Sequence, residues 1–233
     1  WSSSRVTNRA MPDPSALLLY GANACGREIA SWAEHARFGD HPVHVLGFID
    51  DMSPDPFVNG RPVWGLNEAA RLHEGTYVVV AVGSPELRER LVAQAEAAGF
   101  TSAPPLIHRS VEYDRDHVSI GDGSVIGPGT TLTTNIEIGL HVQINLHCTI
   151  AHDAVLGDFV TLSPGCHVSG RVKVEKGAYL GTGVVTVQGK VGRPLVIGEG
   201  AVLGAGSAIL KDVPPNATVF GVPARPLPRQ PPS

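Results

Sequence analysis

An aliphatic residue recurs at every sixth position through the middle and later parts of the chain. The uninterrupted series is Ile120, Ile126, Leu132, Ile138, Ile144, Ile150, Leu156, Leu162, Val168, Val174 and Leu180, and it resumes at Ile197, Leu203 and Ile209. Small or β-branched residues form a second series four positions after these. A period of six fits neither an amphipathic helix nor a single strand. It is typical of a parallel β-helix, in which each repeat buries its apolar side chain against neighbouring repeats.

We interpret the pattern as a triangular coil with three hexapeptides per turn, so that residues 18 apart stack and the repeats make about five coils. We expect corners with special backbone angles at the glycines that follow the aliphatic positions. These are Gly121, Gly127, Gly139, Gly157, Gly181, Gly198 and Gly204. Cys148 and Cys166 should stack in the core, within the Cα separation of about 4.4–6.8 Å that a disulfide needs. We favour two reduced core thiols, as in a cytosolic protein.

Composition limits the class of partner. The 233 residues suffice for two modest domains, and the net charge of −4 without a cluster of Lys and Arg argues against nucleic acid as a partner. No apolar run approaches the roughly 20 residues of a membrane helix, and no signal-peptide core precedes the first predicted strand. We therefore expect a cytoplasmic protein with a small-molecule ligand and no membrane partner. Residues 1–13 are interpreted as leader or vector-derived sequence.

The N-terminal third alternates between strand and helix patterns. Predicted strands span Ala16–Tyr20, Val43–Asp50 and Tyr77–Val82. A glycine turn, Gly21–Gly26, leads into a helix whose predicted apolar face is Ile29, Trp32, Ala33 and Ala36. A later helix has Ser84 as its N-cap, Pro85 at its first position and Gly99 past its end. We predict a Rossmann-like α/β domain over residues 14–106, the β-helix over 107–212 and a C-terminal extension over 213–233.

The glycine turn resembles two nucleotide-binding signatures without completing either. Asn23 stands where the dinucleotide fingerprint has its middle glycine, and Arg27 and Glu28 replace the Lys and Ser/Thr of a P-loop, which excludes the P-loop. The helix N-terminus could still receive a phosphate. Asp50 or Asp51 at a strand end could bind a nucleoside. A tight turn that binds nothing remains the alternative.

Because residues 18 apart should stack, each histidine of the solenoid belongs to a column of stacked residues that runs along the coil axis. His141, His147 and His167 fall in different columns, which disfavours a metal site within one chain, although zinc ligands assembled across subunits stay open. His152 precedes Asp153 and stacks under Gly170. A histidine can act as general base, a carboxylate can hold its tautomer and an N–H can receive an oxyanion. A solvated corner is the alternative.

Asn145 and Ser163 are also 18 apart and form a second polar pair, expected near His152.

The chain from about Ala16 to Leu227 resembles the sugar O- and N-acyltransferases of the sialic-acid O-acetyltransferase type, which include bacillosamine- and perosamine-pathway N-acetyltransferases. The motifs are Gly21–Gly26 with Arg27 and Glu28, Gly47–Asp51, Ala81–Gly83 with Arg88, Ile107 with His108, Asn145–Asp153, Ser163–Gly165, Gly170 and Gly221–Ala224. They occur in the family's order across both predicted domains.

This resemblance implies a left-handed β-helix, a homotrimer and active sites between adjacent solenoids. It implies His152 as general base and Asp153 as its orienting partner, with acetyl-CoA as cosubstrate and no metal. In the same way Gly170 N–H would bind the thioester oxygen, and Asn145 would position the amino sugar. The remaining implied contacts are Thr182 and Ala205 with pantetheine, and Gly21, Asp50 and Asp51 with the nucleotide. Direct attack is implied, so Cys25 and Cys148 need no nucleophilic role.

The chain departs from the family at two places. Cys25 stands where many relatives have histidine, which affects an expected sugar-phosphate contact. The six-residue register is lost between Thr186 and Ile197, where about five extra residues around Val191–Leu195 should form a lid or a tolerated surface insertion.

The leading hypothesis is N-acetylation of a nucleotide-linked 4-amino-4,6-dideoxy sugar, with O-acetylation of a sialic acid or another sugar hydroxyl as the alternative. A zinc carbonic-anhydrase-like trimer and a non-catalytic scaffold are the remaining alternatives.

Overall fold

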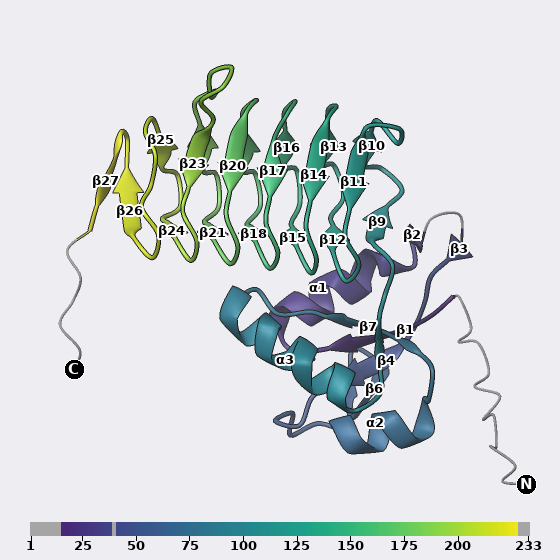
Figure 1. The fold of residues 1–233 in the computed structure, drawn as a ribbon. Coiled ribbons are helices and arrows are strands. Elements are labelled where there is room, and N and C mark those ends of the chain that lie inside the picture. The colour runs from purple at the N-terminus through teal and green to yellow at the C-terminus, as the bar shows by residue number, and fades with distance from the viewer. Residues whose placement is uncertain (1–14, 39–40, 228–233) are drawn as a thin grey trace, which may run out of the picture.

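The computed structural model describes residues 15–38 and 41–227, so the expected leader, residues 1–13, lies outside the described part. A small α/β domain is followed by a long solenoid of short parallel strands (Figure 1). This is the predicted Rossmann-like domain and left-handed parallel β-helix.

The small domain is built on one sheet with the strand order β5-β6-β4-β1-β7-β8. Its strands are β1 (Ala16–Tyr20), β4 (His44–Ile49), β5 (Phe57–Val58), β6 (Arg61–Trp64), β7 (Tyr77–Val80) and β8 (Thr101–Ser102). Its helices are α1 (Ala24–Ala33), α2 (Leu66–Leu72) and α3 (Pro85–Ala97). The β1, β4, β6, β7 and β8 pairings are parallel and the β5–β6 pairing is antiparallel. A buried parallel sheet explains the continuous apolar runs of β1 and β7.

Capping residues decide where the helices of this domain begin. Ser84 accepts a hydrogen bond from Leu87 N–H at 3.3 Å and Pro85 opens α3, as predicted. Asn23 accepts from Cys25 N–H at 3.2 Å, so it caps α1. The prediction that Ala36 extends the apolar face of α1 is wrong: α1 ends at Ala33. Ala36 opens β2 (Ala36–Phe38), a strand that joins the solenoid.

The solenoid has three faces. Face 1 contains β9 (Leu106–His108), β12 (Val125–Ile126), β15 (Gln143–Ile144), β18 (Thr161–Leu162), β21 (Tyr179–Leu180), β24 (Val202–Leu203), β26 (Thr218–Gly221) and β27 (Ala224–Pro226), and β2 and β3 (His41–Pro42) extend it. Face 2 contains β10 (Glu112–Tyr113), β13 (Thr131–Leu132), β16 (Thr149–Ile150), β19 (His167–Val168), β22 (Val185–Thr186) and β25 (Ala208–Ile209). Face 3 contains β11 (Val118–Ile120), β14 (Ile136–Ile138), β17 (Val155–Leu156), β20 (Val172–Val174) and β23 (Leu195–Ile197).

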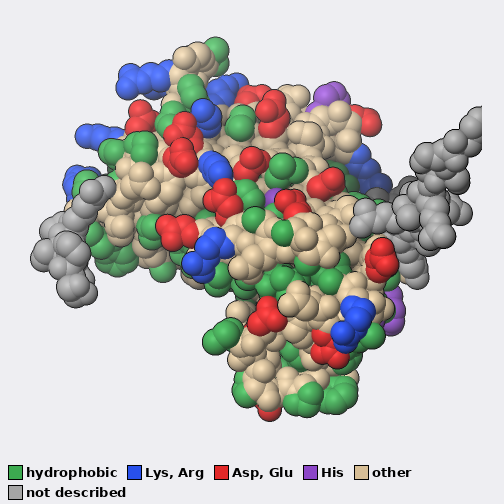
Figure 2. All heavy atoms as spheres, turned by 60° about the horizontal axis from the view of Figure 1, so that its bottom comes forward, with side chains coloured by type: hydrophobic (Ala, Val, Ile, Leu, Met, Phe, Trp, Pro, Cys, Tyr) green, Lys and Arg blue, Asp and Glu red, His purple; other side chains and the backbone are tan. Residues whose placement is uncertain are grey.

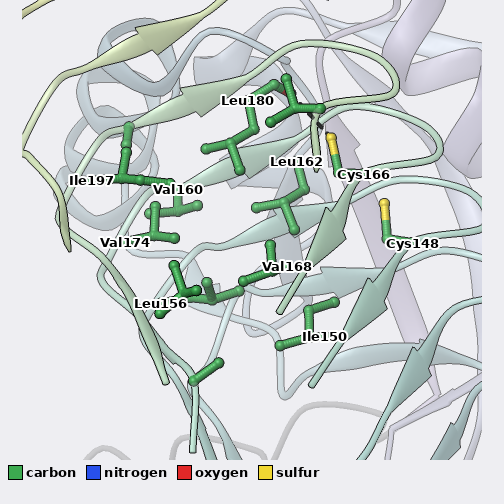
Figure 3. Close-up of a cluster of buried hydrophobic side chains, with 14 of the residues drawn as sticks. Cys148, Ile150, Leu156, Val160, Leu162, Cys166, Val168, Val174, Leu180 and Ile197 are labelled. Atoms are coloured by element: carbon green, nitrogen blue, oxygen red, sulfur yellow. Dashed lines mark hydrogen bonds between the residues drawn. The ribbon is translucent and has the colours of Figure 1, made fainter. Parts of the chain in front are cut away.

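The predicted stacking of residues 18 positions apart is confirmed. Ile126 pairs with Ile144 and Ile144 with Leu162 along face 1, and all three side chains are buried. Cys148 and Cys166 are both free and fully buried in this core, which confirms the prediction of two reduced thiols (Figure 3). Each coil therefore buries its apolar row only through its neighbours, as a solenoid requires.

One residue at each successive corner from Gly123 to Gly183 adopts a left-handed backbone conformation. These positions again recur every six residues: Gly123, Gly129, Asn135, His141, His147, Asp153, Phe159, Gly165, Arg171, Gly177 and Gly183. The glycines that we expected to need special angles are not among them, so that expectation is wrong. They are required by stacking instead, because a Cβ at Gly157 would lie 2.8 Å from Lys176 N in the next coil.

Arg88 joins the two parts of the chain. Its side chain is 1% exposed and it donates to His141 O at 2.9 Å, Phe159 O at 2.6 Å and Thr161 Oγ1 at 2.9 Å, all on the solenoid. It also donates to Gln143 Oε1 at 3.2 Å. Burial lowers the Arg88 pKa to about 10. The small domain is thereby fixed against face 1, with α1 and α3 beside the solenoid (Figure 1).

The break in the repeat is a hairpin between faces 2 and 3. Val155 pairs with Lys173, 18 positions on, whereas Val172 pairs with Leu195, 23 positions on, which confirms five extra residues. Leu195 itself lies in β23, so the protruding segment ends before it. The ladder then continues through β26, which pairs with β24, so the expected C-terminal extension contains a further strand of the solenoid.

Candidate active site

His152 and Asp153 lie at the corner between faces 2 and 3, where β16 passes into β17. His152 Nδ1 lies 2.8 Å from Asp153 Oδ2. An ionised carboxylate only accepts hydrogen bonds, so Nδ1 carries the proton and neutral His152 has its Nε2 lone pair free. Asp153 has a φ of 60°, a conformation that Asp tolerates better than most residues. The corner thus holds an imidazole with one free ring nitrogen against a carboxylate, the arrangement that the predicted roles of His152 and Asp153 need.

Gly170 lies directly against the His152 ring. A Cβ at Gly170 would lie 2.6 Å from His152 Nε2 and 2.7 Å from Cε1, so only glycine leaves the ring in place. Gly170 is buried, and within the described part of the chain its N–H donates to no acceptor. Buried backbone donors are nearly always satisfied. This N–H is therefore available to a ligand oxygen beside a free imidazole nitrogen.

Arg171 completes the corner. Its Nη2 lies 3.4 Å from Asp153 Oδ2, and the hydrogen bond from His152, aided by the charge of Arg171, lowers the pKa of Asp153. The carboxylate consequently stays ionised. Sequence reasoning missed Arg171, although counting 18 residues on from Asp153 identifies it.

The other predicted solenoid residues lie at the corner between faces 1 and 2. Asn145 donates through Nδ2 to Leu162 O at 2.9 Å, and Ser163 Oγ lies 3.0 Å from Tyr179 OH. The expectation that Asn145 and Ser163 lie near His152 is therefore wrong within one chain, because stacking fixes a column and leaves open which corner it occupies.

Thr182 and Ala205, expected to contact pantetheine, are exposed at that same corner between faces 1 and 2. Gly206 N–H donates to Thr182 O at 2.8 Å, so the two positions lie on adjacent coils. Face 2 thus has a predicted catalytic edge and a separate edge for the other predicted contacts.

A cavity of about 630 Å³ lies on the small domain, where β1, β4 and β7 end. Its lining includes Gly21, Asp50 and Asp51, the three predicted nucleotide contacts. Asp50 accepts from Ala22 N–H at 2.9 Å and Met52 N–H at 3.0 Å. The carboxyl ends of parallel strands are the usual ligand crevice of such a sheet. The cavity is hence the candidate nucleotide pocket.

Asp51 also has a structural role at this pocket, since its Oδ1 accepts from Leu66 N–H at 2.9 Å at the start of α2. Its Oδ2 lies 3.4 Å from Tyr20 OH, which also lies 3.2 Å from Gln94 Oε1. Burial, reinforced by the Asp51 charge, raises the Tyr20 pKa to about 12. Tyr20 and Gln94 line the cavity and were missed, because neither belongs to a recognisable motif.

Cys25 and the separate histidines complete the predicted positions. Gln143 Nε2 donates to Cys25 Sγ at 3.0 Å, and burial raises the Cys25 pKa. His141 stacks on Phe159, with ring centroids 5.1 Å apart. His147 is at the corner between faces 1 and 2, and His167 is on β19, so the predicted separation of columns is confirmed. Among residues 15–38 and 41–227, no group of three His, Cys, Asp or Glu side chains could hold a metal ion.

Comparison with known proteins identifies relatives over both parts of the chain. Residues 16–95 match the PglD N-terminal domain. The chain is 36% identical over 219 residues to the GDP-perosamine N-acetyltransferase of Escherichia coli O157:H7, covering 92% of this chain and 97% of that protein.

Solved structures resemble the chain over similar lengths. The acetyltransferase domain of PglB from Neisseria gonorrhoeae FA1090, in complex with acetyl coenzyme A, has 31% identity and a TM-score of 0.79, with 91% of this chain and 98% of that chain covered. PerB from Caulobacter crescentus, in complex with CoA and GDP-perosamine, has 27% identity and a TM-score of 0.79, with 92% and 98% covered. The extent of these matches, across the α/β domain and the solenoid alike, places the chain in the family of hexapeptide-repeat sugar acyltransferases with a PglD-type N-terminal domain.

Proposed function

We propose that this protein is an acetyl-CoA-dependent N-acetyltransferase that acts on the amino group of a nucleotide-linked 4-amino-4,6-dideoxy sugar. One observation carries the proposal: His152, held through Nδ1 by Asp153, lies against a buried Gly170 whose N–H has no acceptor within the described residues. A base with a free nitrogen beside an unused donor suits attack on a thioester carbonyl.

In the proposed reaction the sugar amine attacks the carbonyl carbon of the acetyl thioester directly. His152 Nε2 takes the proton that the amine loses as the N–C bond forms. Gly170 N–H donates to the carbonyl oxygen while it carries negative charge. The C–S bond then breaks, and the proton on Nε2 passes to the departing coenzyme sulfur. No residue of the chain becomes acylated.

The small domain supplies the second half of the proposed site. Its cavity at the strand ends has the position and size for a nucleoside diphosphate, and the start of α1 offers backbone N–H groups to phosphate. Relatives named for GDP-perosamine favour a 4-amino sugar as the acceptor group and a nucleotide as its carrier. Asn145 is proposed to position this sugar.

Within a single copy the cavity of the small domain and the His152 corner lie apart. The small domain packs on face 1, whereas His152 is at the opposite corner of the triangular coil, between faces 2 and 3 (Figure 1). We propose a homotrimer with its axis parallel to the solenoid. Face 2 of each copy, whose outward residues are mainly small and uncharged, would then lie toward that axis. The outward residues of the face 2 strands are Glu112, Thr131, Thr149, His167, Val185 and Ala208, of which four are small and uncharged.

In this arrangement the His152 corner of one copy meets the corner with Asn145, Thr182 and Ala205 of the next. The expected pantetheine contacts then lie across the interface from the base. Sedimentation velocity checks the assembly: a monomer that turns over at the rate of the assembled protein would contradict the shared site.

Activity is tested by incubating acetyl-CoA with UDP-, GDP- and dTDP-linked 4-amino sugars and measuring free thiol. We expect one of these to turn over, and His152→Asn to lose turnover while keeping the oligomer. Turnover of a sialic acid with none of the amino sugars would favour O-acetylation instead, and unchanged turnover in His152→Asn would remove His152 from the mechanism. No helix in the described ranges is long and apolar enough to cross a membrane. The cytoplasm stays a prediction.

A further inference from the structure

The hairpin between β22 and β23 is joined by backbone hydrogen bonds to the corner that carries Gly170. Two backbone hydrogen bonds join its two arms: Lys190 N–H donates to Arg193 O at 2.9 Å, and Arg193 N–H donates to Lys190 O at 3.0 Å. At its base Gly189 N–H donates to Gly170 O at 2.9 Å, so the hairpin begins on the coil directly after Gly170. A Cβ at Gly189 would collide with Arg171 O, which explains why glycine stands there.

A cavity of about 540 Å³ lies at the base of this hairpin. Three cationic side chains line it, Lys190 and Arg193 from the hairpin and Lys211 from the following coil. The cavity's one carboxylate, Asp212, is occupied by Val196 N–H at 3.0 Å. Over residues 15–38 and 41–227, none of the three cations forms an ion pair. The cavity lining therefore carries a net positive charge, three cations against one carboxylate that forms no ion pair with them within the described residues.

Charge along this edge changes from one end to the other. Toward the N-terminal coils the corner between faces 2 and 3 begins with Asp114, Arg115 and Asp116, two carboxylates against one cation, and Asp114 accepts from Thr134 Oγ1 at 2.8 Å. Toward the C-terminal coils it carries Lys190, Arg193 and Lys211. Lys and Arg side chains also gather at this end of the solenoid, at the upper left of Figure 2. The more positive end of the edge is thus the C-terminal one, and it attracts the charged end of an elongated anion more strongly.

The coenzyme of the proposed function has such a shape. Its thioester is at one end of a long uncharged arm, and its diphosphate and 3′-phosphate are at the other. With the thioester beside Gly170, the hairpin is one coil away and Lys211 two, about 5 Å and 10 Å along the axis at the spacing of stacked strands. The cationic cavity is hence reached by extending the arm toward the C-terminal coils.

We propose that the hairpin insertion binds the phosphate groups of the acyl donor, with Lys190 and Arg193 as the recognising side chains. This inference rests on the proposed function for the identity of its ligand. Arg193 offers a planar fork that matches a phosphate, and Lys190 a compact charge. The five inserted residues then determine affinity for the donor, apart from the chemistry at His152.

Calorimetric titration tests the assignment with CoA, 3′-dephospho-CoA and pantetheine. The test protein is the double variant Lys190→Ala, Arg193→Ala, and the control is Lys173→Ala, which removes a cation of face 3 paired with Glu175 at 3.1 Å. We expect the double variant to bind CoA about tenfold more weakly, the change that 1.4 kcal/mol produces. Pantetheine binding and the control should be unchanged. A loss confined to CoA assigns the 3′-phosphate, and an equal loss for 3′-dephospho-CoA assigns the diphosphate.

The outcomes separate this inference from the proposed function. Wild-type binding of CoA and acetyl transfer, with affinities unchanged in the double variant, overturns the inference alone. An equal loss of pantetheine binding does the same, because it shows a distorted edge rather than a lost phosphate contact. Failure of the wild type to bind any of the three compounds overturns both.

Discussion

Gly170→Ala separates the catalytic role of the His152 corner from its structural role. The variant keeps the backbone N–H and adds one methyl group, whose Cβ would lie 2.6 Å from His152 Nε2. The backbone at Gly170 is not left-handed, so alanine is conformationally tolerated there. The neighbour that must move is the tip of a partly exposed side chain, and we expect little loss of stability.

The catalytic cost follows from how far the ring must move. Ordinary contacts of a Cβ begin near 3.4 Å, so His152 Nε2 must retreat by about 1 Å. A misplacement of about 1 Å can cost on the order of 10²-fold in rate. Gly170→Ala should therefore lower kcat about 100-fold while changing the melting temperature by no more than about 2 °C.

Gly157→Ala provides the matched control, because its Cβ would lie 2.8 Å from Lys176 N, a backbone atom that cannot swing away. Overpacking of this kind costs about 1–3 kcal/mol, and each kcal/mol lowers the melting temperature of a chain this size by about 2–4 °C. We expect Gly157→Ala to lose stability and to keep its kcat per folded molecule. Thermal denaturation and initial rates of thiol release, at one protein concentration, measure both quantities. Full kcat in Gly170→Ala would refute the placement of the reacting groups over Gly170.

Further expectations concern charge, protonation and thiols. Arg88→Met should lower the free energy of unfolding by about 3–5 kcal/mol in urea denaturation, because it leaves carbonyl groups of both domains buried without a donor; a loss below 1 kcal/mol would contradict its role as the domain junction. Burial lowers the pKa of His73, His108 and His141, so below about pH 6.5 the unfolded chain binds more protons than the folded one. Stability is then complete above that pH and falls as the pH drops through the folded pKa values, and His141→Gln should shrink the fall in melting temperature between pH 7.5 and pH 5.5. Asp153→Asn should lower kcat by about 10²–10⁴ through loss of the Nδ1–H tautomer, and wild-type kcat in this variant would show that the carboxylate has no orienting role. In the folded protein a bulky thiol reagent should label Cys25 alone, since Cys148 and Cys166 are fully buried, and labelling of all three without denaturant would mean that the solenoid opens readily.

The sequence predicts the solenoid well because its core is one-dimensional. A buried aliphatic every six residues is both the pattern and the packing, so stacking of His152 under Gly170 follows from counting alone. The strands and helices of the small domain are predicted from its apolar runs and helix caps. The five-residue insertion also follows from the register.

The 18-residue period does not show at which corner of the coil a column of residues lies, or which face the small domain covers. The column of Asn145 lies at a different corner from the column of His152, and the choice depends on the winding and on which face the small domain covers. Arg88 is the clearest example, since only the packed structure shows an arginine buried among carbonyl groups without a carboxylate. The left-handed corner residues were hidden as well, because His, Asp, Phe and Arg share that position with glycine and no composition marks it.

The hairpin between β22 and β23 shows where this architecture admits change. Strand pairing continues across it, because Val172 pairs with Leu195, Tyr179 with Val202 and Val185 with Ala208, each 23 positions on. Because each coil touches only the next, a corner can lengthen without disturbing the ladder. Donor affinity could therefore be altered by exchanging one loop, with the catalytic machinery and the acceptor pocket left intact. A chimaera carrying a different loop at this corner is accordingly a practical route to a changed affinity for coenzyme A.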